Sequence, residues 1–101
     1  MLAEFSISPL DKGISLSKYV ARSLELVERS GLPYKITPMG TIVEGDVDEV
    51  FDLIKRCHKR MREDCERVST LVRIDDRAGA TGRIEGKVKA VEEHLGRELM
   101  K

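Results

Sequence analysis

Apolar and polar residues alternate at the start of the chain. Ala3, Phe5 and Ile7 point one way in an extended backbone, and the polar residues between them point the other way. This period of two predicts a half-buried β-strand over residues 2–8, which Pro9 ends.

The pattern then changes to a helical period. Ser15 or Ser17 is expected to cap the N-terminus of a helix, and Gly31 with Pro33 to end it. Its apolar positions share one side and are Leu16, Val20, Leu24 and Val27.

Two short strands are expected next, over Tyr34–Met39 and Thr41–Glu44. Met39-Gly40 forms a tight hairpin between them. Asp46 and Glu49 then have the spacing of a capping box, which predicts the start of a second helix. The apolar stripe of that helix is expected to be Val47, Val50, Phe51, Ile54, His58, Met61 and Cys65.

Strand character returns over residues 66–76, with Leu71, Arg73 and Asp75 on one face. A glycine-rich loop, Arg77–Arg83, leads to a last helix that Gly96 ends. Its apolar positions are Ile84, Val88, Val91 and Leu95.

The expected order is therefore β-α-β-β-α-β followed by an extra C-terminal helix. This order predicts an α+β, ferredoxin-like fold, in which two helices cover one face of a four-stranded antiparallel sheet. A length of 101 residues suits one domain spanning residues 1–101.

The other face of the sheet is expected to carry small hydroxyls, single charges and Leu71. A solvated face is usually richer in Lys, Glu and Thr. We therefore expect the C-terminal helix or a neighbouring subunit to cover this face, and the alternative is a face that is simply solvated.

Composition narrows the function classes. Eighteen basic residues balance eighteen acidic ones, so the chain lacks the basic excess typical of nucleic-acid-binding proteins. Only 4% of residues are aromatic, and the aromatic strand residues on which an RNA-recognition motif stacks bases are missing. The glycine-rich loop lacks the spacing of a P-loop, and no Ser-His-Asp or Cys-His arrangement is recognisable. We expect no enzyme activity, no metal and no cofactor.

Two cysteines bear on the compartment. Cys57 and Cys65 lie eight residues apart in one expected helix, roughly 12 Å at ~1.5 Å per residue, which is too far for a disulfide. Free thiols fit a reducing compartment. The opening residues do not resemble a signal peptide, and no apolar run could cross a bilayer, so we expect a cytoplasmic protein without membrane contact.

Three segments in order, MLAEFSISPL, PMGTIVEGD and VRIDDRAG, resemble the YkoF-like thiamine-binding family. The resemblance covers nearly the whole chain. It implies a ferredoxin-like protomer with an added C-terminal helix, dimers joined through their sheets that pair into tetramers, and a pocket for thiamine or its hydroxymethylpyrimidine part. It implies a binding protein, acting as carrier or sensor, rather than a catalyst.

Thiamine carries an aminopyrimidine that needs hydrogen-bond partners and a cationic thiazolium that favours a carboxylate. Thr41 and Glu44 supply both, although they face opposite ways in a regular strand. Arg73 and Asp75 could instead form an interface ion pair or hold an anion. The candidate ligand-binding residues are Ser6, Ser8, Tyr34, Thr37, Thr41, Glu44, Arg73 and Asp75.

A second interpretation stays open. Many ferredoxin-like domains are regulatory, so the chain could bind another metabolite or an anion at a subunit interface.

Overall fold

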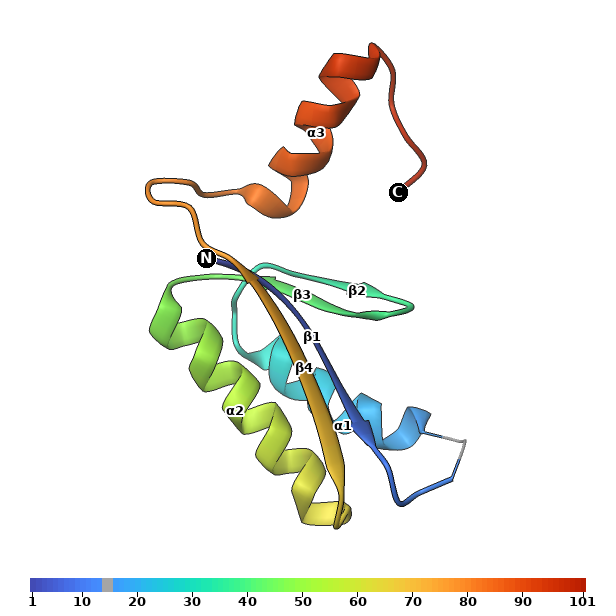
Figure 1. Cartoon of the computed structure of the whole chain (residues 1–101). Helices are drawn as coiled ribbons and strands as arrows, with labels where there is room; N and C mark the ends of the chain where they lie inside the picture. The colour runs from blue at the N-terminus through green and yellow to red at the C-terminus, as the bar shows by residue number, and fades with distance from the viewer. Residues whose placement is uncertain (14–15) are drawn as a thin grey trace.

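The computed structural model describes residues 1–13 and 16–101 and has the predicted ferredoxin-like α+β fold. Its four strands form one antiparallel sheet in the order β2-β3-β1-β4 (Figure 1). The elements are β1 Leu2–Pro9, α1 Ser17–Arg29, β2 Tyr34–Thr37, β3 Gly40–Glu44, α2 Val47–Asp64, β4 Val68–Asp75 and α3 Arg83–Leu95.

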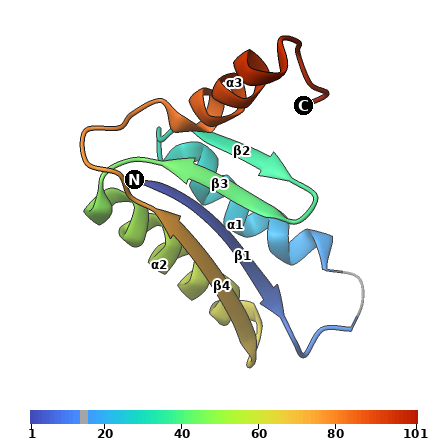
Figure 2. The ribbon, with the colours of Figure 1, turned by 45° about the horizontal axis from the view of Figure 1, so that its top comes forward.

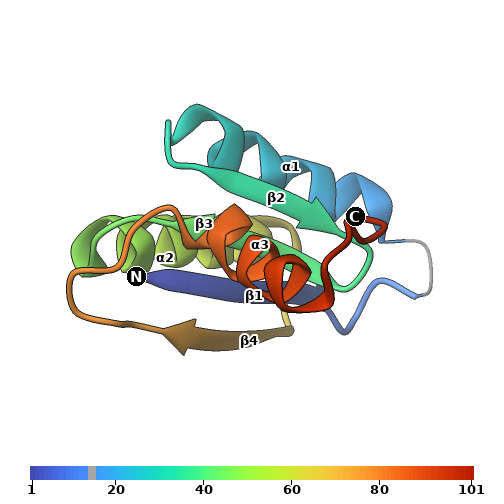
Figure 3. The same cartoon turned by 90° about the horizontal axis from the view of Figure 1, so that it is seen from above.

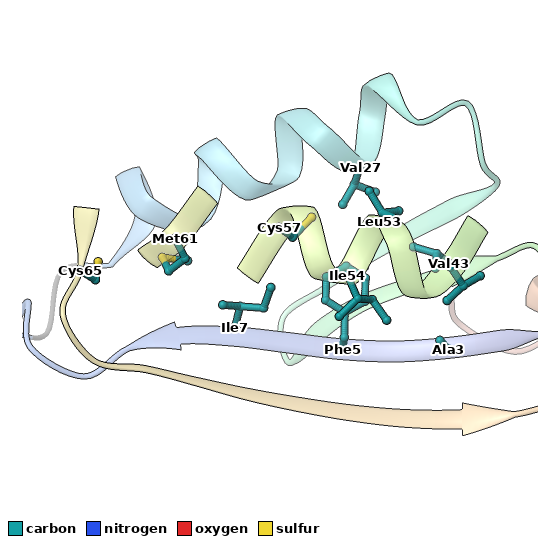
Figure 4. Close-up of a cluster of buried hydrophobic side chains, with 11 residues drawn as sticks. Ala3, Phe5, Ile7, Val27, Val43, Leu53, Ile54, Cys57, Met61 and Cys65 are labelled. Carbon is teal, nitrogen blue, oxygen red and sulfur yellow. The ribbon is translucent and has the colours of Figure 1, made fainter. Parts of the chain in front are cut away.

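The core lies between the sheet and the helices α1 and α2, which cover the same face (Figure 4). Ala3, Phe5 and Ile7 point into it from β1, as the alternating pattern predicts. Val27 meets them from α1 and Leu53 from α2. Burial of these apolar side chains is the main force that holds the helices to the sheet.

The start of α2 is as predicted, but its buried side is rotated. Asp46 accepts a hydrogen bond from the backbone N–H of Glu49, and the Glu49 side chain accepts one from the N–H of Asp46. The expected core positions Val47 and Phe51 are about half exposed. The predicted positions Val50, Ile54, Met61 and Cys65 are buried, and Leu53 and Cys57 complete the buried side. A helical period fits either edge of this stripe, and the packing of α1 decides which edge is buried.

The start of α1 differs from the prediction. Ser17 is the first helical residue and not the cap, because Leu16 holds the N-cap position without a side-chain hydrogen bond. The other proposed cap, Ser15, lies outside the described residues.

The hairpin is also shorter than predicted. β2 ends at Thr37, and Pro38 and Met39 form the turn before β3 begins at Gly40. Consequently β1 extends beyond the end of its neighbour β3. β3 pairs with β1 only as far as Phe5, whereas β4 pairs with β1 along its whole length, to Pro9. Beyond Phe5, one edge of β1 has no strand beside it.

Helix α3 stands apart from α1 and α2, near the end of the sheet where β1 begins (Figures 1 and 2). Its first half touches the sheet, and Gly96 ends it in the left-handed conformation as expected. Seen from above, α3 lies on the side of the sheet opposite α1 and α2 (Figure 3), the side that we call the open face. It covers one end of that face only, because Leu71 stays 71% exposed.

In the described part of the chain, no helix is long and apolar enough to cross a membrane.

Candidate functional site

A cavity of about 200 Å³ lies where the β2–β3 hairpin ends beside β1, above α1. We call it the hairpin cavity. Four of the predicted ligand residues line it: Ser6, Ser8, Thr37 and Thr41. The structure therefore brings together half of the candidate set, from three different strands.

Thr41 and Ser23 are the two buried polar residues that line this cavity. Thr41 is 7% exposed and faces the same side of the sheet as Phe5, with which it is paired. Its hydroxyl makes no hydrogen bond among the described residues, and since no buried side-chain oxygen or nitrogen there lacks a partner, this hydroxyl is accessible from the cavity. A ligand that bonds to it therefore displaces no hydrogen bond within the protein.

The backbone of Ile7 offers two more groups. Met1 and Gly45 exchange both hydrogen bonds of a close pair, and alternation in an antiparallel ladder then turns Met1, Ala3, Phe5 and Ile7 toward β3. β3 begins only at Gly40 and does not extend alongside Ile7. The N–H and C=O of Ile7 therefore face the hairpin cavity, whose lining includes this residue. Together they form an adjacent donor and acceptor.

The other polar groups of the cavity are used to different degrees. The Thr37 hydroxyl donates to the carbonyl of Gly40 and accepts from the N–H groups of Met39 and Gly40, so it holds the turn. Ser23 donates to the carbonyl of Cys57. The hydroxyls of Ser6 and Ser8 are half-buried and have no partner among the described residues.

Apolar side chains complete the walls. Val20 and Leu24 come from α1, and Ile36 and Met39 from the hairpin. Gly40 lets the hairpin approach β1 closely, because a Cβ there would lie 3.0 Å from the carbonyl oxygen of Phe5. The cavity therefore combines apolar faces with a few convergent polar groups, as small-molecule sites do.

Glu44 lies elsewhere, at the opposite end of β3. It is buried, and its carboxylate accepts hydrogen bonds from the backbone N–H groups of Arg83 and Ile84 at 2.9 and 3.3 Å. Gly82, the N-cap of α3, supplies no side-chain cap of its own. Glu44 thus caps α3 from a neighbouring strand, a favourable position for a negative charge.

A larger groove of about 720 Å³ runs between this carboxylate and the start of α2. We call it the Glu44 groove. Tyr34 lines it on one side and Ile84 on another. Its carboxylates at Asp46 and Glu49 already serve the capping box of α2.

Arg73 and Asp75 occupy a third place, on the open face beside Leu2 and Glu4. Asp75 pairs with Lys87 of α3 and not with Arg73. The hydrogen bond from Lys87 holds the pKa of Asp75 below its ordinary value of 3.8. Asp75 therefore helps to fix α3 to the sheet.

Burial explains the state of the core cysteine. Cys57 is fully buried, and loss of hydration raises the pKa of its thiol to about 11. Both Cys57 and Cys65 are free, as their spacing predicts. His58 is half-buried, and its Nδ1 lies 2.6 Å from the Thr70 hydroxyl oxygen.

The sequence alone missed the backbone of Ile7 and the α1 residues Val20, Ser23 and Leu24 as parts of a site. The helical period places the apolar ones on the side of the helix that faces the core. One signal was available: an eight-residue first strand beside a hairpin of shorter strands leaves part of one edge unpaired.

The fold and the hairpin cavity together define a ferredoxin-like α+β domain with a small, mostly apolar pocket. Comparison with known families makes this specific. The family model described as thiamine-binding protein matches residues 3–92, and the chain belongs to that family.

Curated relatives agree. The UPF0045 protein MJ1052 of Methanocaldococcus jannaschii is 40% identical over 93 residues, which cover 92% of this chain and 93% of that protein. The UPF0045 protein YqgV of Bacillus subtilis is 32% identical over 100 residues, covering 93% of this chain and 96% of the relative.

Solved structures have the same fold. The crystal structure of MJ1052 superposes with a TM-score of 0.84 and covers 91% of this chain and 95% of that one. A candidate thiamine biosynthesis/salvage protein from Thermotoga maritima is 26% identical, with a TM-score of 0.79 and coverage of 89% and 96%.

Proposed function

We propose that this protein binds thiamine, or its hydroxymethylpyrimidine part, in the hairpin cavity. Membership of the thiamine-binding protein family supports the ligand class. The observation that carries the location is the accessible, unpartnered hydroxyl of Thr41, a residue that is otherwise buried, beside the free backbone edge of Ile7.

The chemistry of an aminopyrimidine suits these groups. Such a ring presents an acceptor nitrogen next to an amino donor, and the N–H and C=O of one extended residue match that pair. Ile7 would supply the two backbone groups and Thr41 a third contact. The apolar walls from α1 and the hairpin would pack on the faces of the ring.

The volume of the hairpin cavity bears on where the rest of the ligand would lie. A cavity of about 200 Å³ is smaller than the usual 300–1,000 Å³ of drug-sized sites, so it suits one ring rather than the whole of thiamine. The thiazolium would then lie at the mouth. The Glu4 side chain is nearby, since its Cγ lies 3.6 Å from where a Cβ of Gly40 would be. Its carboxylate suits a cation.

The proposed role is that of a non-catalytic carrier or sensor in the cytoplasm. The family is described by binding and not by a reaction. The lining of the cavity offers hydroxyls, one backbone edge and apolar walls, and these residues form no nucleophile–base pair.

We further propose that the chain works as an oligomer, a tetramer built from two dimers. The open face supports this, because α3 leaves Leu71 exposed there. The same exposed face supports a second candidate function, because a subunit interface there would offer a site. In that case the chain would be a regulatory domain that binds another metabolite or an anion at the interface. A thermal-shift screen of metabolites separates the two, since a ligand of the folded state raises the Tm.

Isothermal titration calorimetry tests the proposal directly. The purified protein is titrated with thiamine, with hydroxymethylpyrimidine and with the isolated thiazole alcohol as a control. We expect binding of the first two and none of the third, because the pyrimidine makes the buried contacts. Absence of heat with both pyrimidine ligands at high micromolar concentration would exclude the proposal.

A further inference from the structure

A second, smaller cavity lies at the base of α3, where the loop after β4 meets the start of β1. It has a volume of about 160 Å³, and we call it the arginine cavity. Its charged lining consists of Glu44, Asp75, Arg77, Arg83 and Lys87. These residues come from two strands, the glycine-rich loop and α3.

Of the two carboxylates that line this cavity, one is paired with a cation and the other is hydrogen-bonded by backbone groups and keeps its charge. The Glu44 carboxylate accepts the N–H groups at the start of α3, and Asp75 pairs with Lys87. The ammonium of Met1 donates to the carbonyl of Gly45 and lies 4.0 Å from Asp76.

The two arginines are different. Neither Arg77 nor Arg83 forms an ion pair within residues 1–13 and 16–101. Elsewhere, Arg22 and Arg60 share the carboxylate of Asp64. Lys87 and Asp75 cancel, and the two arginines outweigh the single negative charge of Glu44, so the lining of the arginine cavity carries a surplus of positive charge.

Guanidinium groups bind oxyanions through paired N–H donors, and the planar fork fits phosphate better than it fits chloride. The cavity volume is below the range for drug-sized ligands, so a nucleotide does not fit inside. We propose that the arginine cavity binds a compact oxyanion with the chemistry of phosphate, either inorganic phosphate or the terminal group of a small phosphate monoester.

This site is separate from the hairpin cavity. β1 runs from Leu2 at one to Ile7 at the other, roughly 16 Å at ~3.3 Å per residue. A bound anion would bridge Arg77 of the loop and Arg83 of α3, next to the start of β1. It would therefore fasten α3 to the sheet, and binding would stabilise the folded protein.

The experiment uses the full chain at constant ionic strength, with inorganic phosphate and glycerol 3-phosphate as separate ligands and chloride as the control anion. Binding is measured by calorimetry and by the Tm. Arg77→Gln and Arg83→Gln are the test variants. Arg97→Gln removes the same charge from an exposed position outside the cavity and is the matched control.

We expect a saturable rise in Tm with phosphate but not with chloride, a loss of at least tenfold in affinity in both test variants, and none in Arg97→Gln. Binding of the monoester alone would identify a phosphorylated metabolite as the source of the anion. The inference would be overturned if neither phosphate ligand bound. It would also be overturned if the Arg77→Gln and Arg83→Gln variants bound phosphate as tightly as the unmodified protein. The same variants are also titrated with thiamine, so that a failure of phosphate binding is distinguished from a failure of the proposed thiamine binding.

Discussion

At the scale of single residues, two threonines of the hairpin have opposite roles. The Thr37 hydroxyl makes three hydrogen bonds within the turn, whereas the hydroxyl of Thr41, the more buried residue, has no partner among the described residues. The sequence places both in a candidate site and cannot separate them. The difference depends on the turn geometry and on the side of the sheet that each residue faces.

This contrast gives a matched pair of variants. Thr41→Val removes a hydroxyl that we expect to bond only to the ligand. Affinity for hydroxymethylpyrimidine should fall by about 2- to 13-fold, the equivalent of a hydrogen bond of about 0.5–1.5 kcal/mol. The free energy of unfolding should stay about the same, because this hydroxyl makes no hydrogen bond within the protein.

Thr37→Val is the control and should do the reverse. Loss of the turn bonds should lower the free energy of unfolding by about 1–3 kcal/mol. Calorimetry and urea denaturation check both variants. A Thr41→Val protein that is destabilised while binding normally would contradict the assigned roles.

At the scale of elements, the order and type of every helix and strand follow from the sequence. A period of two in the apolar residues predicts a strand, and a period of 3.6 predicts a helix. The capping box of Asp46 and Glu49 marks the start of α2 from neighbouring residues alone. Two features could not be read in this way. The buried side of α2 depends on where α1 packs, and the cap of α3 comes from Glu44, some forty residues earlier in the chain.

The cap on α3 is itself testable. Glu44→Ala removes the acceptor of two backbone N–H groups, and hydrogen bonds to a charged group are worth about 1.5–3 kcal/mol each. Amide hydrogen exchange should show faster exchange at the start of α3 and unchanged protection in the core around Leu53. Glu44→Gln keeps one acceptor oxygen and should be intermediate.

The control is Glu85→Ala, at an exposed position in the first turn of α3 whose side chain accepts no N–H of that turn. Equal exchange in Glu44→Ala and Glu85→Ala would show that Glu44 does not hold the helix.

Acid should release α3 before the core. The pKa of Asp75, which joins β4 to α3, is lowered chiefly by the hydrogen bond from Lys87. A carboxyl whose pKa is lowered by folding stabilises the protein above its unfolded value and loses that effect as pH falls through the folded value. Protection of α3 should therefore be constant from pH 7 to about 5 and decline below about 4.

Hydrogen exchange or NMR line shapes at several pH values follow this loss. The hydrogen bond from Arg22 also lowers the pKa of Asp64, but buried apolar contacts join α1 to α2 as well. Simultaneous loss of α3 and core protection at pH 4 would argue against an independently anchored helix.

At the scale of the whole molecule, the open face points to assembly. Leu71 lies midway along the edge strand β4 and is 71% exposed, and α3 reaches only one end of the face. We expect size-exclusion chromatography with light scattering to give the mass of four chains of 11.4 kDa each. Leu71→Glu should reduce that mass, because it places a charge in the proposed contact.

Leu10→Glu is the control for assembly. Leu10 is also exposed, at 52%, but lies beyond the end of β1. A wild-type protein with the mass of a single chain would exclude the oligomer, and equal effects of both substitutions would place the contact elsewhere.

The central claim is that the hairpin cavity holds the pyrimidine of the ligand. Titration of ¹⁵N-labelled protein with hydroxymethylpyrimidine, followed by amide chemical shifts, tests it most directly. We predict that the largest shifts occur at Ile7, Ser8 and Thr41, on the free edge of β1 and the facing strand. Shifts centred on Gly45 and Ile84 would place the ligand in the Glu44 groove, and either that result or an unchanged spectrum would contradict the claim.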